Sequence, residues 1–395
     1  MNPWNLSDDE LKKRGGICTA EEICQQPEVW EEALSAVQQQ AERIEAFIEP
    51  LLAKKDLRII FTGAGTSAYA GDIIAPYLRQ KLGRDVLSFA TTDIVSAPYQ
   101  FLQPDLPTVL VSFARSGDSP ESIGAFDLAE QLVREVYQIV ITCNPQGALA
   151  RKSAERQEHT LTLLMPPRTN DRGFAMTSSF SCMLLTGLLI FDLKNLPDNA
   201  ALVKKIAGAG RRVLSAGHGL PELATAGFER IVFLGSGALY GLARETCLKV
   251  LELTGGRIAA VAETMMGFRH GPKSIVNDRT LIVMWLSSDS YIRQYDMDLL
   301  REFHHDAGDF KVLAVSAAPD GEVAALADYV LALDEEAAGQ WGTDSYLALG
   351  YVLFDHILAL AASMGKGVAP DTPCPSGSVN RVVKGVTLHS LEDNH

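Results

Sequence analysis

The chain has no excess of positive charge. Its 395 residues include 49 acidic and 35 basic side chains, which gives a formal net charge of −14. This balance argues against a nucleic-acid backbone or an anionic membrane as partner, because both attract basic surfaces. It is still compatible with a small anionic ligand, since a local pocket can be positive on an acidic protein.

Metal-binding, disulfide and secretion patterns are also missing. The six cysteines are scattered without a C-x-x-C motif, and the sequence shows no H-x-x-x-H or clustered acidic pattern. The opening stretch MNPWNLSDDELKKR is charged and lacks the apolar core of about 7–15 residues that a secretory signal needs. We therefore expect a cytoplasmic protein with reduced thiols, no zinc site, and no metal or redox cofactor.

The most apolar long segment runs from 346 to 364. It carries Asp355 and His356 in its middle. Ionisable groups are costly inside a bilayer. The sequence therefore predicts a buried helix rather than a membrane span.

An internal repeat organises the chain. The stretch 58-RIIFTGAGTSAYAG-71 is similar to 230-RIVFLGSGALYGLA-243. Three further pairs keep the same offset to within a residue: 108–122 with 280–294, 86–91 with 258–263, and 138–143 with 311–316. Four elements in register indicate a tandem duplication.

Each copy alternates short apolar runs with helical patterns. Apolar runs without alternation are typical of parallel strands that are buried on both faces. The intervening stretches, such as 120–135 and 240–253, space their apolar residues as helices do. We therefore expect an α/β fold with two tandem, doubly wound domains, each a parallel sheet flanked by helices.

Two further segments lie outside the repeat. The first segment, residues 1–50, has helical periodicity, and its Thr19 and Glu22 form the pattern of a capping box. The second segment, residues 366–395, is rich in Pro and Gly. It begins with polar residues and ends with basic and β-branched ones, a pattern that predicts packing onto the rest of the protein. The expected order is a helical segment, the first domain, the second domain and a C-terminal tail, at 1–50, 51–200, 215–365 and 366–395.

A Gly-x-Gly motif follows the first strand of each copy. Gly63, Gly65 and Ala68 satisfy the glycine part of a dinucleotide-binding fingerprint. The nearest acidic residue, Asp93, lies further along than the roughly 20 positions that this fingerprint needs. In the second copy Tyr240 occupies the third position. A dinucleotide site is therefore poorly supported, and a tight turn before a helix is the better interpretation of the second copy.

Hydroxyl groups follow two neighbouring strands of the first copy. Gly65, Thr66 and Ser67 come after one strand, while Ser116 and Ser119 come after the other. Ligands bind beyond the carboxyl ends of parallel strands, and helix starts favour anions. The second copy has Ala238, Leu239 and Asp289 in place of Thr66, Ser67 and Gly117. This asymmetry predicts a phosphate site in the first copy only.

Several motifs give the chain a family resemblance. They are 63-GAGTS-67, 115-RSGDS-119, 176-MTSSF-180, 268-FRHGPK-273 and 380-NRVVKG-385. With them the chain resembles the SIS (sugar isomerase) domain proteins over nearly its whole length. It looks most like the AgaS family of galactosamine-6-phosphate deaminase/isomerases, also labelled tagatose-6-phosphate ketose/aldose isomerases. More distantly, it resembles the isomerase half of glucosamine-6-phosphate synthase.

The resemblance implies that Ser67, Ser116 and Ser119 hold the phosphate of a sugar. The family pattern S-x-S-G-x-T reads 114-ARSGDS-119 here, so Ala114 stands where a serine is expected. Because alanine has no side-chain donor, we expect Arg115 to supply the missing contact.

Glu252 is the candidate general base. It lies on the same predicted helix face as Glu245, in the last turn before Gly255, where the helix macrodipole disfavours a carboxylate. The resemblance implies that Glu252 moves a proton between C2 and C1 of the sugar. Glu263, at the end of a strand, is the alternative base. We interpret Glu245 and Lys249 as an ordinary solvated i,i+4 pair.

His270 is the candidate for opening the sugar ring. It is flanked by Arg269 and Lys273, a positive cluster in an acidic chain, and histidine exchanges protons near neutral pH. The resemblance implies that His270 acts in ring opening, often across a dimer interface, and that Lys384 of the tail closes over the sugar. It thereby implies a homodimer with shared active sites.

The implied reaction converts galactosamine 6-phosphate to tagatose 6-phosphate and ammonia in amino-sugar catabolism. A plain aldose–ketose isomerase would use the same residues without releasing ammonia. A non-catalytic sugar-phosphate-binding regulator is the third alternative. The retained Glu252, His270 and Lys384 favour catalysis, as does the lack of a basic helix-turn-helix in 1–50. Galacto and gluco substrates are equally compatible with these residues.

Overall fold

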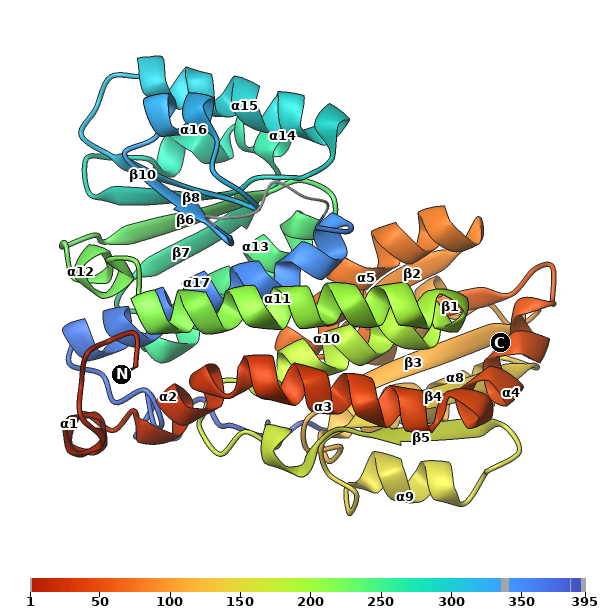
Figure 1. Ribbon diagram of the computed structural model, residues 1–395. Helices are drawn as coiled ribbons and strands as arrows, with labels where there is room; N and C mark the ends of the chain where they lie inside the picture. The colour runs from red at the N-terminus through yellow and green to blue at the C-terminus, as the bar shows by residue number, and fades with distance from the viewer. Residues whose placement is uncertain (1, 335–340, 384, 392–395) are drawn as a thin grey trace.

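A computed structural model describes residues 2–334, 341–383 and 385–391 (Figure 1). The first sheet has the all-parallel order β2-β1-β3-β4-β5. Its strands are β1 (Arg58–Gly63), β2 (Val86–Ala90), β3 (Thr108–Ala114), β4 (Val136–Thr142) and β5 (Thr160–Leu164).

The second sheet repeats this arrangement. Its parallel order, β10-β9-β8-β6-β7, is the order of the first sheet listed from the opposite edge. Its strands are β6 (Arg230–Gly235), β7 (Ala259–Glu263), β8 (Thr280–Trp285), β9 (Lys311–Ser316) and β10 (Tyr329–Ala332). The predicted tandem α/β fold is confirmed, and β5 and β10 add an edge strand to the four elements seen in each copy of the repeat.

Helices connect and cover the strands. In and around the first sheet they are α5 (Thr66–Leu82), α6 (Thr91–Ser96), α7 (Pro98–Phe101), α8 (Pro120–Leu132), α9 (Ala148–Ala154), η1 (Pro167–Thr169), α10 (Ser178–Ile190), η2 (Leu193–Asn195) and α11 (Leu196–Ala216). Around the second sheet they are α12 (Leu220–Ala224), α13 (Ala238–Leu253), α14 (Met265–Phe268), η3 (Pro272–Ile275), α15 (Ser290–His305), α16 (Gly321–Leu326) and α17 (Asp344–Gly365).

The N-terminal segment is helical as expected, with α1 (Asp8–Lys13), α2 (Ile17–Cys24), α3 (Gln26–Gln39) and α4 (Ala41–Leu52). The capping box predicted at Thr19 and Glu22 is wrong, because both residues lie inside α2. The Thr19 hydroxyl donates to Asp371 of the tail over 2.7 Å, and Glu22 accepts backbone N–H groups from the loop before α10. The capping box of this segment is instead formed by Ser7 and Glu10.

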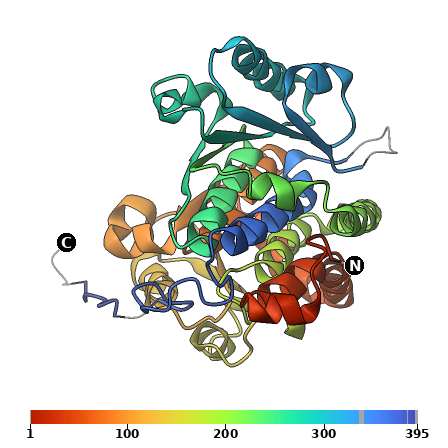
Figure 2. The same cartoon turned by 90° about the vertical axis from the view of Figure 1, so that its left-hand side faces the viewer.

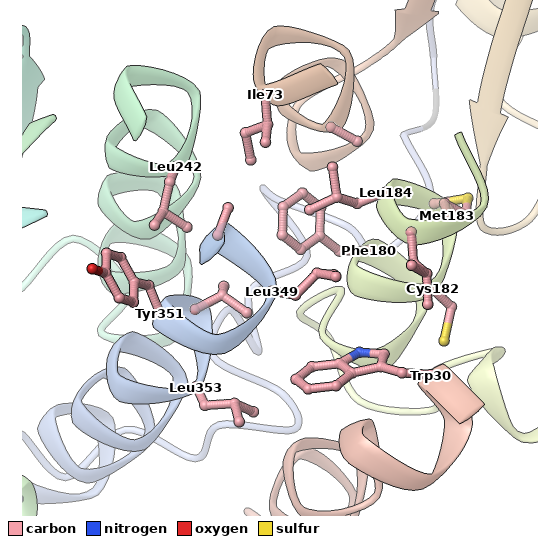
Figure 3. Packing of buried hydrophobic residues seen from close by; sticks show 14 of the residues in the cluster. Trp30, Ile73, Phe180, Cys182, Met183, Leu184, Leu242, Leu349, Tyr351 and Leu353 are labelled. Carbon is pink, nitrogen blue, oxygen red and sulfur yellow. The ribbon is translucent and has the colours of Figure 1, made fainter. Parts of the chain in front are cut away.

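A helical layer between the two sheets forms a common core (Figures 1 and 2). Figure 3 shows Trp30 of α3, Phe180 of α10, Leu242 of α13 and Leu349 of α17 converging within it. Each of these side chains is at most 1% exposed. Burying such a side chain contributes about 1.5–3 kcal/mol, so this layer joins the two repeats into one packed unit.

Helix α17 contains the apolar segment that the sequence singled out. Among the described helices it is the one long and apolar enough by itself to cross a membrane, and 94% of that window is buried inside the fold. Asp355 and His356 are buried with it. The prediction of a buried helix is confirmed.

The Gly-x-Gly motifs build the same strand-to-helix turn in both copies. A Cβ on Gly63 would lie 2.9 Å from the Ser67 carbonyl oxygen, and a Cβ on Gly235 would lie 2.2 Å from that of Leu239. Gly65 and Gly237 adopt φ values of 55° and 57°, which disfavour side chains. Since both copies need these glycines to turn, the motif by itself does not mark a ligand site.

Candidate functional site

A small cavity lies at the carboxyl ends of β1 and β3. The sheet order reverses between these two strands, which is where doubly wound folds bind ligands. The cavity has a volume of about 110 Å³. Its lining residues are Ala64, Ser67, Phe113, Ala114, Arg115, Ser116, Ser119, Ser122, Met176, Arg381, Val382 and Val383. We call this cavity the cradle.

Serine hydroxyls line the cradle. Ser67, Ser116 and Ser119 lie there together, as the sequence predicted, and Ser122 joins them. The Ser119 hydroxyl donates to Ser122 over 2.7 Å. Ser122 was missed as a site residue, although its position one helical turn after Ser119 was a usable signal. Together, these hydroxyls and the adjoining helix starts can accommodate a phosphate group.

The corresponding helix start in the second copy, that of α15, is capped by a carboxylate. Asp289 caps α15 and accepts N–H bonds from Tyr291 and Ile292 over 2.9 and 3.0 Å. In contrast, Ser119 precedes α8 without a side-chain cap. An anion would therefore be repelled at α15 but could be received at α8.

Two residues predicted to bind phosphate do not line the cradle. Gly65 shapes the turn before α5, as its φ value shows. Thr66 is buried, and it lies near enough to Glu245 of α13 to oppose the rise in the pKa of that carboxyl. Successive helical residues point in directions about 100° apart, so Thr66 faces α13 while Ser67 faces the cradle.

Arg115 has its guanidinium group in a buried network of backbone contacts. It donates to the carbonyl oxygens of Phe174 and Ala175 over 3.1 and 3.3 Å, and to that of Arg381 over 3.0 Å. These donors bind the loop before α10 and the tail. Arg115 therefore forms a wall of the cradle and joins the loop before α10 to the tail.

The tail forms another wall of the cradle. Arg381 donates from Nε to the Gly173 carbonyl oxygen over 3.2 Å and from its guanidinium to that of Asp171. Val382 and Val383 then line the cavity. Lys384, the predicted sugar-contacting lysine, lies outside the described residues.

Helix α13 carries a buried trio of charged residues. The Lys249 ammonium contacts the Glu252 carboxylate and lies 3.6 Å from Glu245 Oε1. The side chains of Glu245 and Lys249 are 0% exposed, so the predicted solvated pair is wrong. The reason is tertiary, because this face of α13 packs against α5 and α17.

The environment shifts the pKa values of Glu245 and Lys249. Burial raises the pKa of Glu245 to about 8, while Lys249 opposes the shift. Burial by itself would lower the pKa of Lys249, but Glu245 and Glu252 outweigh it and raise the value. The Glu252 side chain remains 24% exposed and lies near enough to Arg115 for electrostatic interaction. Glu252 is therefore the partly open member of the trio, next to a wall of the cradle.

Glu263, the alternative base, accepts hydrogen bonds from the residue that follows it in the chain. The Glu263 carboxylate accepts from the Thr264 backbone N–H over 2.7 Å and from its hydroxyl over 3.3 Å. It lies at the end of β7, an edge strand of the second sheet. It thus belongs to the second sheet, whereas the cradle belongs to the first.

His270 lies on an exposed turn between α14 and η3. The positive cluster predicted around it is neutralised, since Glu302 of α15 pairs with both Arg269 and Lys273, and Asp306 pairs with Lys273 over 2.6 Å. Within the described part of the chain, no hydrogen bond or ion pair joins the His270 side chain to the cradle or to Glu252.

Comparison with known proteins identifies the family. The SIS domain model matches residues 51–192 and 223–353, and each matched segment contains one of the two sheets. The AgaS protein of Streptomyces coelicolor is 47% identical, over 95% of this chain and 96% of its own length. This chain is a SIS domain protein of the AgaS family.

Two further relatives carry functional names. A Shewanella protein named D-galactosamine-6-phosphate deaminase AgaS is 42% identical, over 97% of this chain and 95% of its own. The crystal structure of tagatose-6-phosphate ketose/aldose isomerase from Escherichia coli superposes with a TM-score of 0.87 at 41% identity, covering 95% of this chain and 97% of that one.

Proposed function

We propose that this protein converts galactosamine 6-phosphate to tagatose 6-phosphate and ammonia, as an amino-sugar-phosphate deaminase/isomerase. The observation that carries the proposal is the hydroxyl-lined cradle of the first repeat; in the second repeat, Asp289 caps the corresponding helix start. The similarity to proteins named as galactosamine-6-phosphate deaminases supports the choice of substrate.

In this proposal the cradle holds the phosphate through Ser67, Ser116 and Ser119. Glu252 takes the proton from C2 of the open-chain amino sugar, leaving an enolamine, and returns it to C1. The C2 amine becomes a ketimine, to which water adds, and ammonia leaves as the C2 ketone forms. No step needs a metal or a redox cofactor.

The buried trio suits Glu252 to this role. At neutral pH Glu245, with a pKa of about 8, is mostly protonated. The positive charge of Lys249 is then available to stabilise the ionised Glu252 carboxylate, which it contacts. Glu252 can thus act as a base without a second negative charge beside it.

We further propose a cytoplasmic homodimer with shared sites. His270 is exposed on its own chain, so a partner subunit would have to present it to the cradle for it to open the sugar ring. In the sequence, Lys384 follows directly on Val382 and Val383, which line the cradle.

Plain isomerisation is the second candidate, favoured by the name of the Escherichia coli structure. The test is to incubate the purified protein with galactosamine 6-phosphate and with galactose 6-phosphate, and to measure ammonia and tagatose 6-phosphate. We expect stoichiometric ammonia and tagatose 6-phosphate from the amino sugar. Turnover of galactose 6-phosphate alone would favour the plain isomerase, and turnover of neither would favour a regulator.

A further inference from the structure

A second, larger cavity occupies the equivalent position on the second sheet. It lies beyond the ends of β6 and β8, where the order of that sheet reverses. Gly237 follows β6, Ser288 to Ser290 follow β8, and Ala317 follows β9 on its lining. Its volume is about 760 Å³, within the range of about 300–1,000 Å³ typical of small-molecule sites.

The first repeat closes this cavity from the other side. Pro76, Tyr77 and Gln80 of α5 line it, together with residues 341–345 at the start of α17. Figure 1 shows the start of α17 beside α5, and the two helices are in contact. The cavity is therefore a groove between the two repeats, a place where small-molecule sites are common.

This groove is negatively charged, whereas a phosphate needs a positively charged site. Among the described residues that line it there is no Lys, Arg or His, but there are two carboxylates, Asp289 and Asp344. Both Asp344 oxygens accept bonds from Ser287 and Ser288. Asp289 caps α15 through Oδ1, and its Oδ2 takes part in neither capping bond. Among the described residues no hydrogen bond reaches this Oδ2, so one carboxylate oxygen at the groove can receive a cationic ligand.

The remaining lining groups suit a sugar ring. Ser288, Ser290 and Thr343 supply hydroxyl groups, while the half-buried Tyr77 and Ile292 supply apolar surface. We propose that this groove binds an unphosphorylated amino sugar, with the ammonium group at Asp289 and the ring between α5 and α15. The site is distinct from the cradle and does not depend on the function proposed for it.

Calorimetric titration with galactosamine tests this proposal. The wild-type protein should bind one galactosamine per chain. Gln80→Trp, which places an indole in the groove from an exposed position, should weaken binding at least about ten-fold through steric exclusion. Asp289→Asn, which keeps the helix cap but removes the charge, should weaken it about two- to five-fold.

Two control variants locate the site. Arg79→Trp changes the neighbouring exposed residue of α5, which does not line the groove, and should leave galactosamine binding unchanged. The double variant Ser116→Ala plus Ser119→Ala should also bind galactosamine normally. Absence of binding to the wild type at millimolar galactosamine, normal binding to Gln80→Trp or Asp289→Asn, or loss in the serine variant would overturn the proposal.

Discussion

At the scale of single residues, the candidate site depends on which carboxylate keeps its charge. Lys249 lies between Glu245 and Glu252, and burial raises the pKa of Glu245 to about 8. Glu252 contacts the ammonium and is the more exposed of the two acids. The same helix face therefore holds a fully buried carboxyl, with a raised pKa, and a partly exposed one that contacts the ammonium.

Replacing Glu252 by Gln should remove the base while leaving phosphate binding intact. General base catalysis is typically worth about 10²–10⁴-fold, so turnover of galactosamine 6-phosphate should fall by at least about 100-fold. Exchange of the C2 hydrogen with solvent, followed by NMR, should fall in parallel. Glu263→Gln is the matched control and should exchange normally; the reverse pattern would transfer the role to Glu263.

The cradle serines give a second prediction at this scale. Ser116→Ala plus Ser119→Ala removes two hydroxyl donors to a dianion, and each such bond is worth about 1.5–3 kcal/mol. Calorimetry should show binding of a sugar 6-phosphate inhibitor weakened at least about ten-fold, with an unchanged unfolding temperature. Ser215→Ala, on the exposed side of α11, should bind as the wild type does. Unchanged affinity in the double variant would place the phosphate elsewhere.

At the scale of elements, the site is assembled by segments that are far apart in the chain. The loop before α10 accepts hydrogen bonds from Arg115 after β3 and from Arg381 in the tail. Asp371 fixes the start of the tail to α2 by accepting from the Thr19 N–H over 2.8 Å. The tail thus reaches the cradle along a defined path and becomes part of its wall.

Replacing Arg381 should loosen the wall that the tail forms in the cradle. Arg381→Ala deletes the bonds to Gly173 and Asp171, so KM for the sugar phosphate should rise about 5–30-fold, from losing roughly 1–2 kcal/mol of positioning. Arg381→Lys should recover part of the loss. Asn380→Ala is the control, because the bond that its side chain makes among the described residues stays within the tail, to the Gly377 carbonyl oxygen. Steady-state kinetics that match the wild type in Arg381→Ala would show that this contact does not position the site.

At the scale of the whole molecule, the two repeats share one helical core but differ in what their sheet ends hold. The first sheet ends in the hydroxyl-lined cradle, and the second ends in the acidic groove. His270 projects from an exposed turn of the second repeat. In the proposed homodimer, a second copy of the chain would bring His270 to the cradle.

Mixed dimers should reveal such sharing. A purified heterodimer of one Glu252→Gln chain and one His270→Asn chain contains one intact shared site, and should show about half of the wild-type turnover. Each parent homodimer should be nearly inactive on the cyclic substrate. A heterodimer as inactive as its parents would indicate that both residues act within one chain.

The sequence by itself determined the architecture and the place of the cradle. Continuous apolar runs, the repeat and the glycine turns are local signals, and parallel strands must end at a common edge. The clustering of Ser67, Ser116 and Ser119 follows from that rule. The sequence also shows that Asp289 replaces a glycine in the second copy, and the structure shows that it caps α15 there.

Only the tertiary structure decided which polar groups are buried and which partners they take. An i,i+4 pair such as Glu245 and Lys249 has the same local sequence pattern whether its helix lies on the surface or in a core. Here the pair is buried because α13 packs against α5 and α17. Thr19 resembles a helix cap but bonds to Asp371, 352 residues away. Such contacts depend on segments that meet only in the folded chain, and so no local pattern could have predicted them.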